Sequence, residues 1–482
     1  MALLGRFAIV LGFVMICGPV IADTPAGPEV RFHGSNTVGA RLAPRLIEAY
    51  LKQRDANASF SGWQRFSEPV EVDGQTKQES YQVLDVTSRD SGLPSRIYVR
   101  PYGSKTAFDA LGAHNAEVGM ASRPVKAEEL LKLAAIGDMT SDRNEHIIAL
   151  DGIAVIVNPD NRVSSLTMDQ VKRIFACEIT DWSQVGGSGG RIQTYARDAN
   201  SGTYDTFKSL VLETSELCDN ARRYEDSTQL VGDVRGDPNG IGFVGMAYVG
   251  EGSKGAKALK LDEGWISVGA SDFSVKTEEY PLSRRLYFYT PDNTSEFVRG
   301  FIRFVKSEEG QRVVSTAASG DDADRYVDLN VGDSGSKEAK EHRLATCRAA
   351  AIEVQDPKIL GELIRDTQGA DRLSVTFRFE TAKDNLENRA RDDLTRLVDF
   401  MKQPENSGRA LLLLGFADNK GDYKANCGLS QKRADTVASA LRGQVPSPAL
   451  VRGYCEEAPV AWDDPNQKEG NPKNRRVEAW LR

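Results

Sequence analysis

Residues 197–203, RDANSGT, bring together the hydrogen-bond donors of an oxyanion-binding loop. Arg197 carries a planar guanidinium, and Ser201 and Thr203 add hydroxyl groups. Gly202 has no side chain, so the backbone N–H groups beside it can approach a ligand closely. If a helix begins here, its free N–H groups also face the anion. The stretch predicts a phosphate-type site, and a Ser-Gly turn that caps an ordinary helix is the alternative interpretation.

Three segments nearer the start of the chain have a similar composition. GSNTVG at residues 34–39 and GSKTAF at residues 103–108 each precede an amphipathic run, and GMASRP at residues 119–124 adds a hydroxyl and a second guanidinium. Small, hydroxyl-rich loops at helix N-termini are suited to hold anions. Their recurrence favours one shared anion pocket over unrelated helix caps. The candidate ligands in these segments are Ser35, Asn36, Thr37, Ser104, Ser122 and Arg123.

Length and charge limit the classes of function. A chain of 482 residues is long enough for two or three domains. Its net charge of -8 argues against binding to nucleic acid, which needs a basic surface. The four histidines are scattered without ligand spacing, so we expect no histidine metal centre and no cofactor. An anion site in this chain must therefore be local.

Residues 1–22 have the pattern of a secretory signal peptide. A basic residue precedes an apolar run over residues 7–16, and small residues then offer a cleavage site before Asp23. The run is too short to cross a membrane. Ile16 argues against lipid attachment at Cys17, because a bulky side chain stands where a small one is needed. We expect the mature protein to begin near Asp23, in the periplasm, and not to span a membrane.

Apolar runs and helical periodicity alternate along the first part of the chain. Residues 152–157, 241–249 and 285–289 indicate buried strands, whereas residues 167–175 and 296–306 show helical periodicity. This alternation predicts a mixed α/β architecture built in layers.

A change of composition marks the second part of the chain. Gly, Ser, Asp and Lys accumulate after Asn330, which predicts a linker with a helix over residues 336–370. Residues 341–365 favour helix, residues 373–379 alternate as a half-buried strand, and residues 385–401 show helical periodicity. A second, smaller domain is expected here.

Asp418 and Arg433 form a candidate zwitterion site in this second domain. Asp418 lies in a polar loop after the apolar run LLLLGFA, and LSQKRA at residues 429–434 opens a helix that carries Arg433 on its first turn. An acid and a guanidinium that face each other can take an ammonium and a carboxylate group. A structural ion pair or a solvated surface is the alternative.

The order of six motifs in the first part resembles the periplasmic phosphate-binding receptors of ABC importers. GSNT, GSKTAF, GMASRP, DGIAVIVNP, IFACEITDWSQVGG and RDANSGTYDTF follow one another, and the resemblance covers about residues 28–335. It implies a two-lobed type II periplasmic-binding-protein domain over residues 23–335, with the first lobe at residues 23–150 and 285–335 and the second at residues 151–284. Hinge closure over phosphate follows from that layout, and an ABC permease is a further implied partner. The implied ligands are Ser35, Asn36, Thr37, Ser104, Arg197, Ser201, Gly202 and Thr203.

Arg123 departs from the pattern of these receptors. The best-known members carry an aspartate at this position, which accepts the proton of the ligand and thereby rejects fully ionised sulfate. A guanidinium cannot accept a hydrogen bond, so that discrimination is missing here. Asp198 or Asp205 is an alternative acceptor, and sulfate, phosphonate and organic phosphates stay open as ligands beside phosphate.

Residues 371–482 resemble the OmpA-like peptidoglycan-binding domain, an α+β fold. FRFET, GFADNKGD, LSQKRADTVASAL and KNRRVE stand in the order of that family. The resemblance implies that Asp418 and Arg433 hold the diaminopimelate of a stem peptide, with Asn426 nearby. Ala417 replaces the usual threonine before the aspartate, which leaves the charge pair intact.

Cysteine pairing is expected in the oxidising periplasm. Once Cys17 is removed with the signal peptide the count is odd, so one cysteine is left over. Domain membership is the only filter on the connectivity, and it favours two disulfides and one free thiol. These are Cys177 with Cys218 in the second lobe, Cys427 with Cys455 in the C-terminal domain, and a free Cys347 in the linker region.

The two parts together predict a periplasmic solute-binding protein that binds phosphate, or a similar tetrahedral oxyanion, between two lobes and attaches noncovalently to peptidoglycan. A phosphatase or phosphotransferase with Ser201 or Thr203 as nucleophile is one alternative, but no histidine, cysteine or acidic cluster stands at a spacing that would activate it. A wall-bound adhesive or structural module without a ligand is the other.

Overall fold

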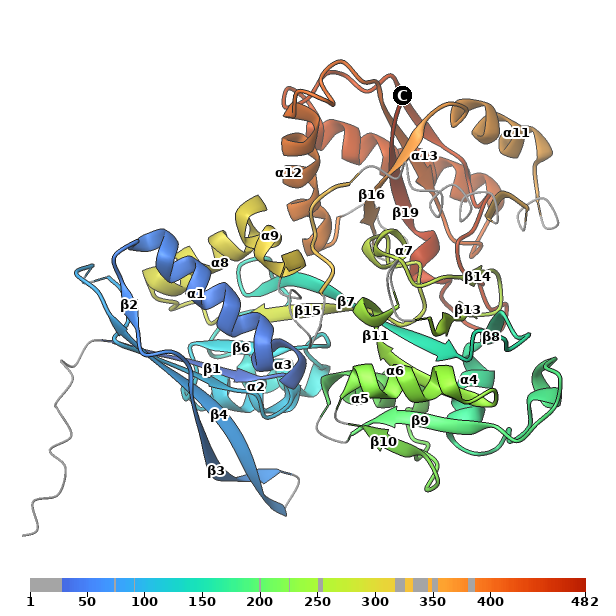
Figure 1. The fold of residues 1–482 in the computed structure, drawn as a ribbon. Coiled ribbons are helices and arrows are strands. Elements are labelled where there is room, and N and C mark those ends of the chain that lie inside the picture. Colours follow the sequence, from blue (N-terminus) through green and yellow to red (C-terminus); the bar gives the residue numbers. More distant parts are fainter. Residues whose placement is uncertain are drawn as a thin grey trace, which may run out of the picture.

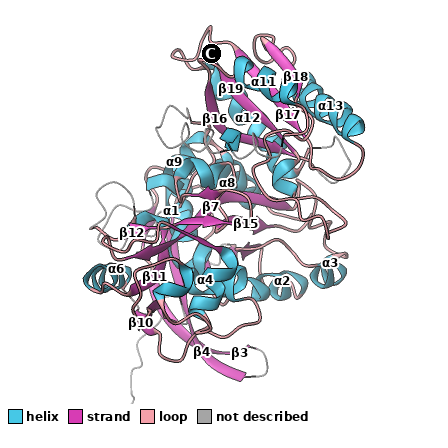
Figure 2. Ribbon diagram, turned by 90° about the vertical axis from the view of Figure 1, so that its right-hand side faces the viewer, coloured by secondary structure: helices cyan, strands magenta, loops and turns pink. Residues whose placement is uncertain are grey.

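The computed structural model describes residues 28–72, 75–90, 92–198, 201–224, 226–249, 255–316, 326–332, 346–348, 354–379 and 386–482. The predicted signal peptide, residues 1–22, and part of the predicted linker lie outside these ranges. The described chain forms a two-lobed α/β body followed by a smaller α+β domain, as the sequence predicts (Figure 1 and Figure 2). No helix within these ranges is long and apolar enough to cross a membrane.

One sheet runs through both lobes. Within the described residues it has twelve strands in the order β10-β9-β11-β7-β15-β6-β1-β5-β4-β2, with β12 beside β7 and β3 beside β4 (Figure 1). In the middle, β7 (Glu145–Val157) pairs antiparallel with β15 (Ser283–Tyr289), so these two strands join the lobes. The first lobe holds β1 (Glu29–Gly34), β2 (Ser59–Phe60), β3 (Gln64–Val72), β4 (Gln75–Thr87), β5 (Arg96–Arg100) and β6 (Val118–Ala121). The second lobe holds β9 (Gln193–Arg197), β10 (Arg222–Tyr224), β11 (Gly240–Gly245) and β12 (Lys257–Ala258), and a small separate sheet of β8 (Ser165–Thr167), β13 (Lys260–Asp262) and β14 (Ser267–Val268).

Parallel pairing places the first-lobe motifs at one edge of the sheet. β1 pairs parallel with both β5 and β6, so the carboxyl ends of the three strands lie side by side. The segments that follow parallel strands therefore meet at this edge. They hold Ser35, Ser104 and Ser122, and they lead into the π-helix η1 (Val38–Leu42), α1 (Ala43–Arg54) and α2 (Ser104–Gly112).

Each lobe has its own aromatic core. In the first lobe, Phe32 contacts the rings of Phe288 and Phe301, beneath α8 (Glu296–Lys306) and α9 (Glu308–Thr316). In the second lobe, Phe207 stacks on Phe243 with ring centroids 3.8 Å apart. The two aromatic clusters lie in different lobes, whereas the larger apolar core continues from α2 of the first lobe into the second lobe. The remaining helical elements of this body are α3 (Ala127–Leu133), α4 (Met168–Phe175), η2 (Trp182–Val185), α5 (Gly202–Phe207), η3 (Lys208–Leu212), α6 (Ser227–Gly236), η4 (Met246–Tyr248) and α7 (Asp272–Lys276).

The predicted elements of this body are present with small changes at their ends. The helix expected at residues 296–306 is α8, and the strand expected at residues 285–289 is β15. The strand expected at residues 241–249 was too long, since it ends at Gly245 where η4 begins. An apolar run that continues from a strand into a short helical turn has no mark in the sequence to separate the two.

The C-terminal domain is a four-stranded sheet in the order β16-β19-β17-β18 with helices packed on it (Figure 2). The helix predicted to open at residues 429–434 begins earlier, because the Asp422 side chain accepts a hydrogen bond from the Ala425 N–H and caps it there. Arg433 therefore lies in the interior of this helix and not on its first turn, which corrects the prediction. The elements are α11 (Pro357–Asp366), β16 (Asp371–Arg378), α12 (Asn388–Lys402), β17 (Leu411–Phe416), α13 (Tyr423–Leu441), β18 (Leu450–Gly453), η5 (Pro472–Asn474) and β19 (Arg476–Leu481).

Both predicted disulfides are confirmed. Cys177 is bonded to Cys218 in the second lobe, and Cys427 is bonded to Cys455 in the C-terminal domain. Cys347 forms no disulfide and is half-buried. The second disulfide joins α13 to the segment that follows β18, beside Asn426.

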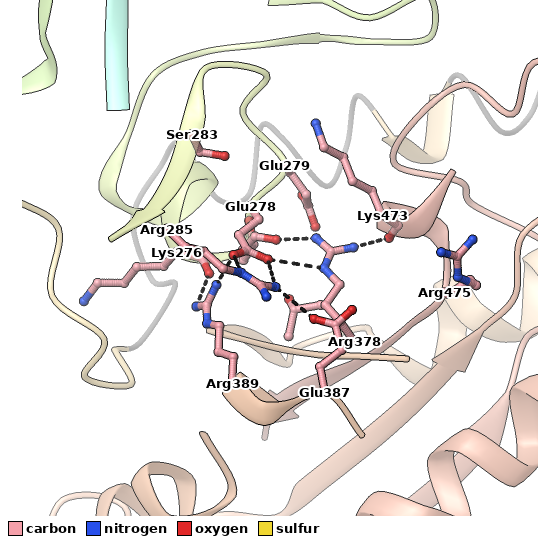
Figure 3. A network of polar contacts seen from close by, with 12 residues as sticks. Lys276, Glu278, Glu279, Ser283, Arg285, Arg378, Glu387, Arg389, Lys473 and Arg475 are labelled. Atoms are coloured by element: carbon pink, nitrogen blue, oxygen red, sulfur yellow. Dashed lines mark hydrogen bonds and ion pairs between the residues drawn. The ribbon is translucent and has the colours of Figure 1, made fainter. Parts of the chain in front are cut away.

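Buried charges connect the C-terminal domain to the hinge region (Figure 3). Glu278, which lies just after α7, contacts the guanidinium groups of Arg285 at 2.5 Å and Arg389 at 2.8 Å. Glu279 accepts a hydrogen bond from Arg372 at 2.5 Å, and both side chains are almost fully buried. Burial alone would raise the pKa of Glu278, but Arg285 and Arg389 hold it below its ordinary value. The ion pairs therefore stay charged in the interface.

The same domain also contacts the outer parts of both lobes. Ionic contacts reach the first lobe, and a tryptophan of the second lobe donates a hydrogen bond to the domain. These contacts are Lys306 with Asp392 at 2.8 Å, Arg391 with Asp142 at 2.8 Å, and Trp265 with the Pro459 carbonyl at 2.7 Å.

Candidate functional site

The first-lobe candidates meet at the shared edge of β1, β5 and β6. The Ser35 N–H donates to the Met120 carbonyl at 2.7 Å. The hydroxyl oxygens of Ser104 and Ser122 are 3.2 Å apart, and the Ser122 N–H donates to Ser104 Oγ at 3.1 Å. Gly34 has a φ of 135°, and a Cβ there would lie 2.0 Å from the Met120 carbonyl oxygen, so only glycine allows β1 to turn into this segment.

Arg123 lies beside this edge, but its guanidinium binds a carboxylate of the protein. Its Nη1 and Nη2 donate to the two oxygens of Glu129 at 2.8 and 2.7 Å, and it lies over the ring of Phe108 at 5.2 Å. Burial acts to raise the pKa of Glu129, but the bond from Arg123 lowers it. The role of Arg123 as an anion ligand stays a prediction, and the described contacts give it a structural one.

The second-lobe loop runs from the end of β9 to the start of α5. Ser201 is buried and stands at the N-cap of α5, directly before Gly202 and Thr203. Arg197 closes β9, and its Nε donates to the Tyr224 carbonyl at 3.3 Å. Its Nη1 donates to the hydroxyl of Ser227 at the start of α6. These bonds hold part of the guanidinium toward α6, and the contact of Arg197 with an anion stays a prediction.

The two lobes touch where Thr37 faces Gly202. A Cβ added to Gly202 would lie 2.3 Å from Thr37 Oγ1 and 2.9 Å from Thr37 Cα. Only glycine allows so close an approach of the two backbones. The start of a helical segment in the first lobe therefore meets the start of α5 in the second.

Arg284 was missed in the sequence, although it contacts both lobes. Its Nη2 donates to Thr37 Oγ1 at 2.7 Å and to the Gly202 carbonyl at 3.2 Å. Nε and Nη2 also donate to one carboxylate oxygen of Asp151, at 3.1 and 2.9 Å. Asp151 lies directly opposite on β7, and the side chains of the pair are only 7% and 12% exposed. We call Thr37, Asp151, Gly202 and Arg284 the interlobe junction.

A signal for this pair was available. Asp151 directly precedes the run at residues 152–157, and Arg284 directly precedes the run at residues 285–289, both of which predicted buried strands. Charged side chains are almost never buried without a partner, so two opposite charges in two core strands indicate a pair.

Two polar atoms beside the junction have no partner. Ser35 Oγ and Asn36 Oδ1 are buried and make no hydrogen bond within the described part of the chain. A buried polar atom without a hydrogen-bond partner lowers the stability of the fold by about 1–3 kcal/mol. Such atoms therefore indicate a place where a ligand supplies the missing hydrogen bond. Across the described ranges, no group of three or more His, Cys, Asp and Glu side chains is arranged to hold a metal ion.

The candidates of the C-terminal domain lie together at one end of β17 and α13. Asp418 is buried, and its Oδ2 accepts a hydrogen bond from Arg475 at 3.1 Å. The side-chain amide of Asn426 donates to the Asp418 carbonyl at 3.1 Å. Arg433 is fully buried, and its Nη1 donates to the Phe416 carbonyl at 3.0 Å.

Two further charged residues belong to this group. Arg475 stands in the KNRRVE motif, and Glu456 accepts from Asn426 at 2.7 Å directly after the disulfide-bonded Cys455. Burial raises the pKa of Glu456, and the neighbouring carboxylates, including Asp418, raise it further. A carboxyl group whose pKa is raised by burial and by neighbouring carboxylates favours a cation beside it, such as an ammonium group.

Comparisons with known proteins assign both parts of the chain to families. The PBP superfamily domain matches residues 62–309, slightly more than half of the 482 residues. The chain belongs to the PBP superfamily. The OmpA family model matches residues 378–475, so an OmpA domain follows the PBP-like one.

Two relatives are named as phosphate-binding proteins. The chain is 31% identical over 235 residues to the phosphate-binding protein PstS of Pseudomonas aeruginosa. The match covers 45% of this chain and 72% of that protein. It is 29% identical over 216 residues to PstS of Staphylococcus haemolyticus, and the match covers 43% of this chain and 67% of that protein. Among solved structures, it is similar to an ABC-type phosphate transport receptor from Vibrio cholerae, with 24% identity, a TM-score of 0.45, and 62% and 99% of the two chains covered. The first domain is thus PstS-like in sequence.

Proposed function

We propose that this chain is a periplasmic receptor that binds phosphate, or a similar tetrahedral oxyanion, between its two lobes and attaches noncovalently to peptidoglycan. The observation that carries the first half is the contact of Thr37 with Gly202, which brings two hydroxyl-rich helix starts together beside the unpartnered Ser35 Oγ and Asn36 Oδ1. Donors from two lobes can replace the hydration shell of a small anion only if the lobes meet in this way. The names of the PstS relatives point to the same ligand.

Hydroxyl and backbone N–H groups form most of the ligand set that we propose, with Arg197 as the main cation and Arg123 as a second one. Asn36 Oδ1 is suited to the role that an aspartate has in the best-known receptors. A monoprotonated phosphate can donate its proton to this oxygen, whereas sulfate has none to donate. The proposed ligands are Ser35, Asn36, Thr37, Ser104, Ser122, Arg123, Arg197, Ser201, Gly202 and Thr203.

Calorimetry of the mature full-length protein with phosphate and with sulfate tests this proposal. We expect binding of phosphate, and Arg197→Ala should abolish it because the guanidinium supplies the main positive charge. Arg299→Ala, on the exposed face of α8, removes the same charge away from the site and is the control. Absence of both heat and a thermal shift at millimolar phosphate would contradict the receptor and favour a wall module without a ligand.

The wall site is tested by sedimentation with purified sacculi. Asp418→Ala and Arg433→Ala should release the protein, because they remove the groups proposed to hold the ammonium and carboxylate of a diaminopimelate. Asp435→Ala, on the exposed side of α13, is the matched control. Circular dichroism separates release from unfolding, since Arg433 is fully buried. Retention of folded Asp418→Ala and Arg433→Ala on the sacculi would contradict the assignment.

A phosphatase is the competing class. Hydrolysis of an aryl phosphate that is lost in Ser201→Ala would favour it over the receptor.

A further inference from the structure

We propose that Arg284 is a positioning residue of the anion site, which directs the Thr37 hydroxyl toward the ligand and joins the two lobes in their closed arrangement. This inference rests on the proposed phosphate site and adds the residue that organises it. Arg284 comes from β15, between the lobes, and not from any of the four loops that the sequence marks as anion-binding.

The hydrogen bonds of Arg284 reach one acceptor in each lobe. A single nitrogen, Nη2, donates to Thr37 Oγ1 at 2.7 Å and to the Gly202 carbonyl at 3.2 Å. The Thr37 carbonyl also accepts from the Tyr326 hydroxyl at 2.7 Å, so the backbone and the side chain of Thr37 are both held. These bonds can form together only while the lobes are close, because Thr37 and Gly202 belong to different lobes.

The bond from Arg284 restricts the direction in which the Thr37 hydroxyl can donate its proton. A guanidinium only donates hydrogen bonds, so Thr37 Oγ1 must be the acceptor in its bond with Arg284. In the described part of the chain, Thr37 Oγ1 takes part in no bond as a donor. Its one proton is therefore available to an acceptor at the junction, and an anion oxygen is the acceptor that the proposed site brings there.

Charge attraction is not the role of Arg284, because Asp151 neutralises it. The pair is almost fully buried, and two of its hydrogen bonds run to one carboxylate oxygen at 2.9 and 3.1 Å. Removal of both charges leaves the net charge of the site unchanged. A loss of affinity in such a variant therefore reports lost orientation of Thr37 and lost contact between the lobes.

Phosphate calorimetry of the full-length Asp151→Asn/Arg284→Gln protein tests this inference. Without the charge-assisted bonds, we expect an affinity lower by on the order of 10- to 100-fold. Arg284→Lys keeps the charge but reaches fewer acceptors, so it should lie between this variant and the wild type. The matched control is Glu296→Gln/Arg299→Gln, which removes an exposed ion pair on α8 and should bind as the wild type does.

A double-mutant cycle with Thr37→Val identifies the route of the effect. If Arg284 acts through the Thr37 hydroxyl, the Asp151→Asn/Arg284→Gln change should cost much less in the Thr37→Val background than in the wild type. Equal losses in both backgrounds would overturn the positioning role. Wild-type affinity of a folded Asp151→Asn/Arg284→Gln protein would overturn it as well.

The distance between fluorescent labels on the two lobes separates this inference from the proposed function. If the wild type binds no phosphate, the proposed function fails, but the bridge by Arg284 can still be measured without a ligand. We expect a larger distance in ligand-free Asp151→Asn/Arg284→Gln than in the ligand-free wild type. Equal distances would overturn the bridging role.

Discussion

Arg284 and Arg285 are neighbours on β15, yet they serve two different regions of the molecule. Arg284 lies in the interlobe junction, where its charge is matched by Asp151 of the same body. Arg285 lies in the interdomain interface, where it contacts Glu278 at 2.5 Å and Glu387 of the C-terminal domain at 3.0 Å. Successive side chains of a strand point to opposite faces, so one strand serves both regions.

The two regions differ in the kind of polar group that they bury. In the interface, Glu278 lies among Arg285, Arg378 and Arg389 (Figure 3). Glu279 pairs there with Arg372. Beside the interlobe junction, the candidate ligands are neutral hydroxyl and amide groups, and Ser35 Oγ and Asn36 Oδ1 have no hydrogen-bond partner within the described residues. Paired buried charges make an interface costly to break, whereas unpartnered neutral groups between two lobes are suited to a ligand from outside.

The largest effect is expected for Glu278→Gln in the interface. The substitution keeps the size of the side chain but leaves several buried guanidinium groups without their common counter-charge. Breaking a buried ion pair from one side costs about 3–5 kcal/mol, so we expect a loss of this order in the free energy of unfolding. Urea unfolding followed by tryptophan fluorescence measures it.

Glu296→Gln is the control for this substitution. Glu296 also contacts two arginines, Arg299 and Arg303, but all three side chains are exposed. Exposed ion pairs contribute about 0–1 kcal/mol, so its unfolding should change little. Equal losses in the two variants would remove the distinction between matched buried charge and surface charge.

The next largest effect is expected at the junction, for Gly202→Ala. The new Cβ would lie 2.3 Å from Thr37 Oγ1, so the lobes cannot reach the same closed arrangement. Overpacking of this kind costs about 1–3 kcal/mol, which corresponds to a loss of about 100-fold in phosphate affinity at the upper end. Calorimetry measures the affinity, and unfolding in urea should stay close to that of the wild type because the open lobes avoid the contact.

Gly232→Ala provides the matched control in the same lobe. Gly232 lies within α6 and has open space where a Cβ would stand. Phosphate affinity should not change in this variant. A similar loss in Gly202→Ala and Gly232→Ala would show that the close approach of Thr37 and Gly202 has no part in binding.

Local sequence predicts the parts of the proposed anion site that depend on backbone geometry. Ser35, Ser104 and Gly202 stand in short motifs whose small residues and hydroxyls have one structural meaning, a loop that leads into a helix. Arg284 was missed because its acceptors Thr37 and Gly202 are 247 and 82 positions away, and no local pattern encodes such a contact. Arg123 is a further case, because its residue type suggested an anion ligand, which stays a prediction, whereas its ion pair with Glu129, six positions on, was not foreseen.

The C-terminal domain has the same division between local and distant signals. The strand that carries Leu411 and the pairing of Cys427 with Cys455 were predicted, because apolar runs and domain membership are visible in the sequence. The start of α13 was placed too late, since Asp422 was not recognised as its cap. Glu456 reaches the candidate wall site only because the segment after β18 folds back toward Asn426. No spacing in the sequence reveals that contact.

The smallest effect is expected from pH, and it distinguishes the two regions again. His33 lies on β1 just before the first anion loop, and burial together with the nearby Arg100 lowers its pKa to about 4. In the unfolded chain the pKa is about 6.5, so the folded state is favoured while the ring is neutral. Stability should therefore fall as the pH decreases from about 6.5 to 4 and should level off below that.

Urea unfolding between pH 7 and 4 tests this in the wild type and in His33→Gln. The variant should lose less stability over this interval, by on the order of 1 kcal/mol, because it has no ring to protonate in the unfolded state. His146, whose pKa burial lowers to about 3, keeps its own share in both proteins. The pKa of Glu278 is also depressed, so its contribution changes in the same direction but at lower pH: it is present at neutral pH and is lost only as the pH falls below the ordinary range of a glutamate. Identical pH profiles of the wild type and His33→Gln would mean that His33 contributes no such sensitivity at the edge of β1.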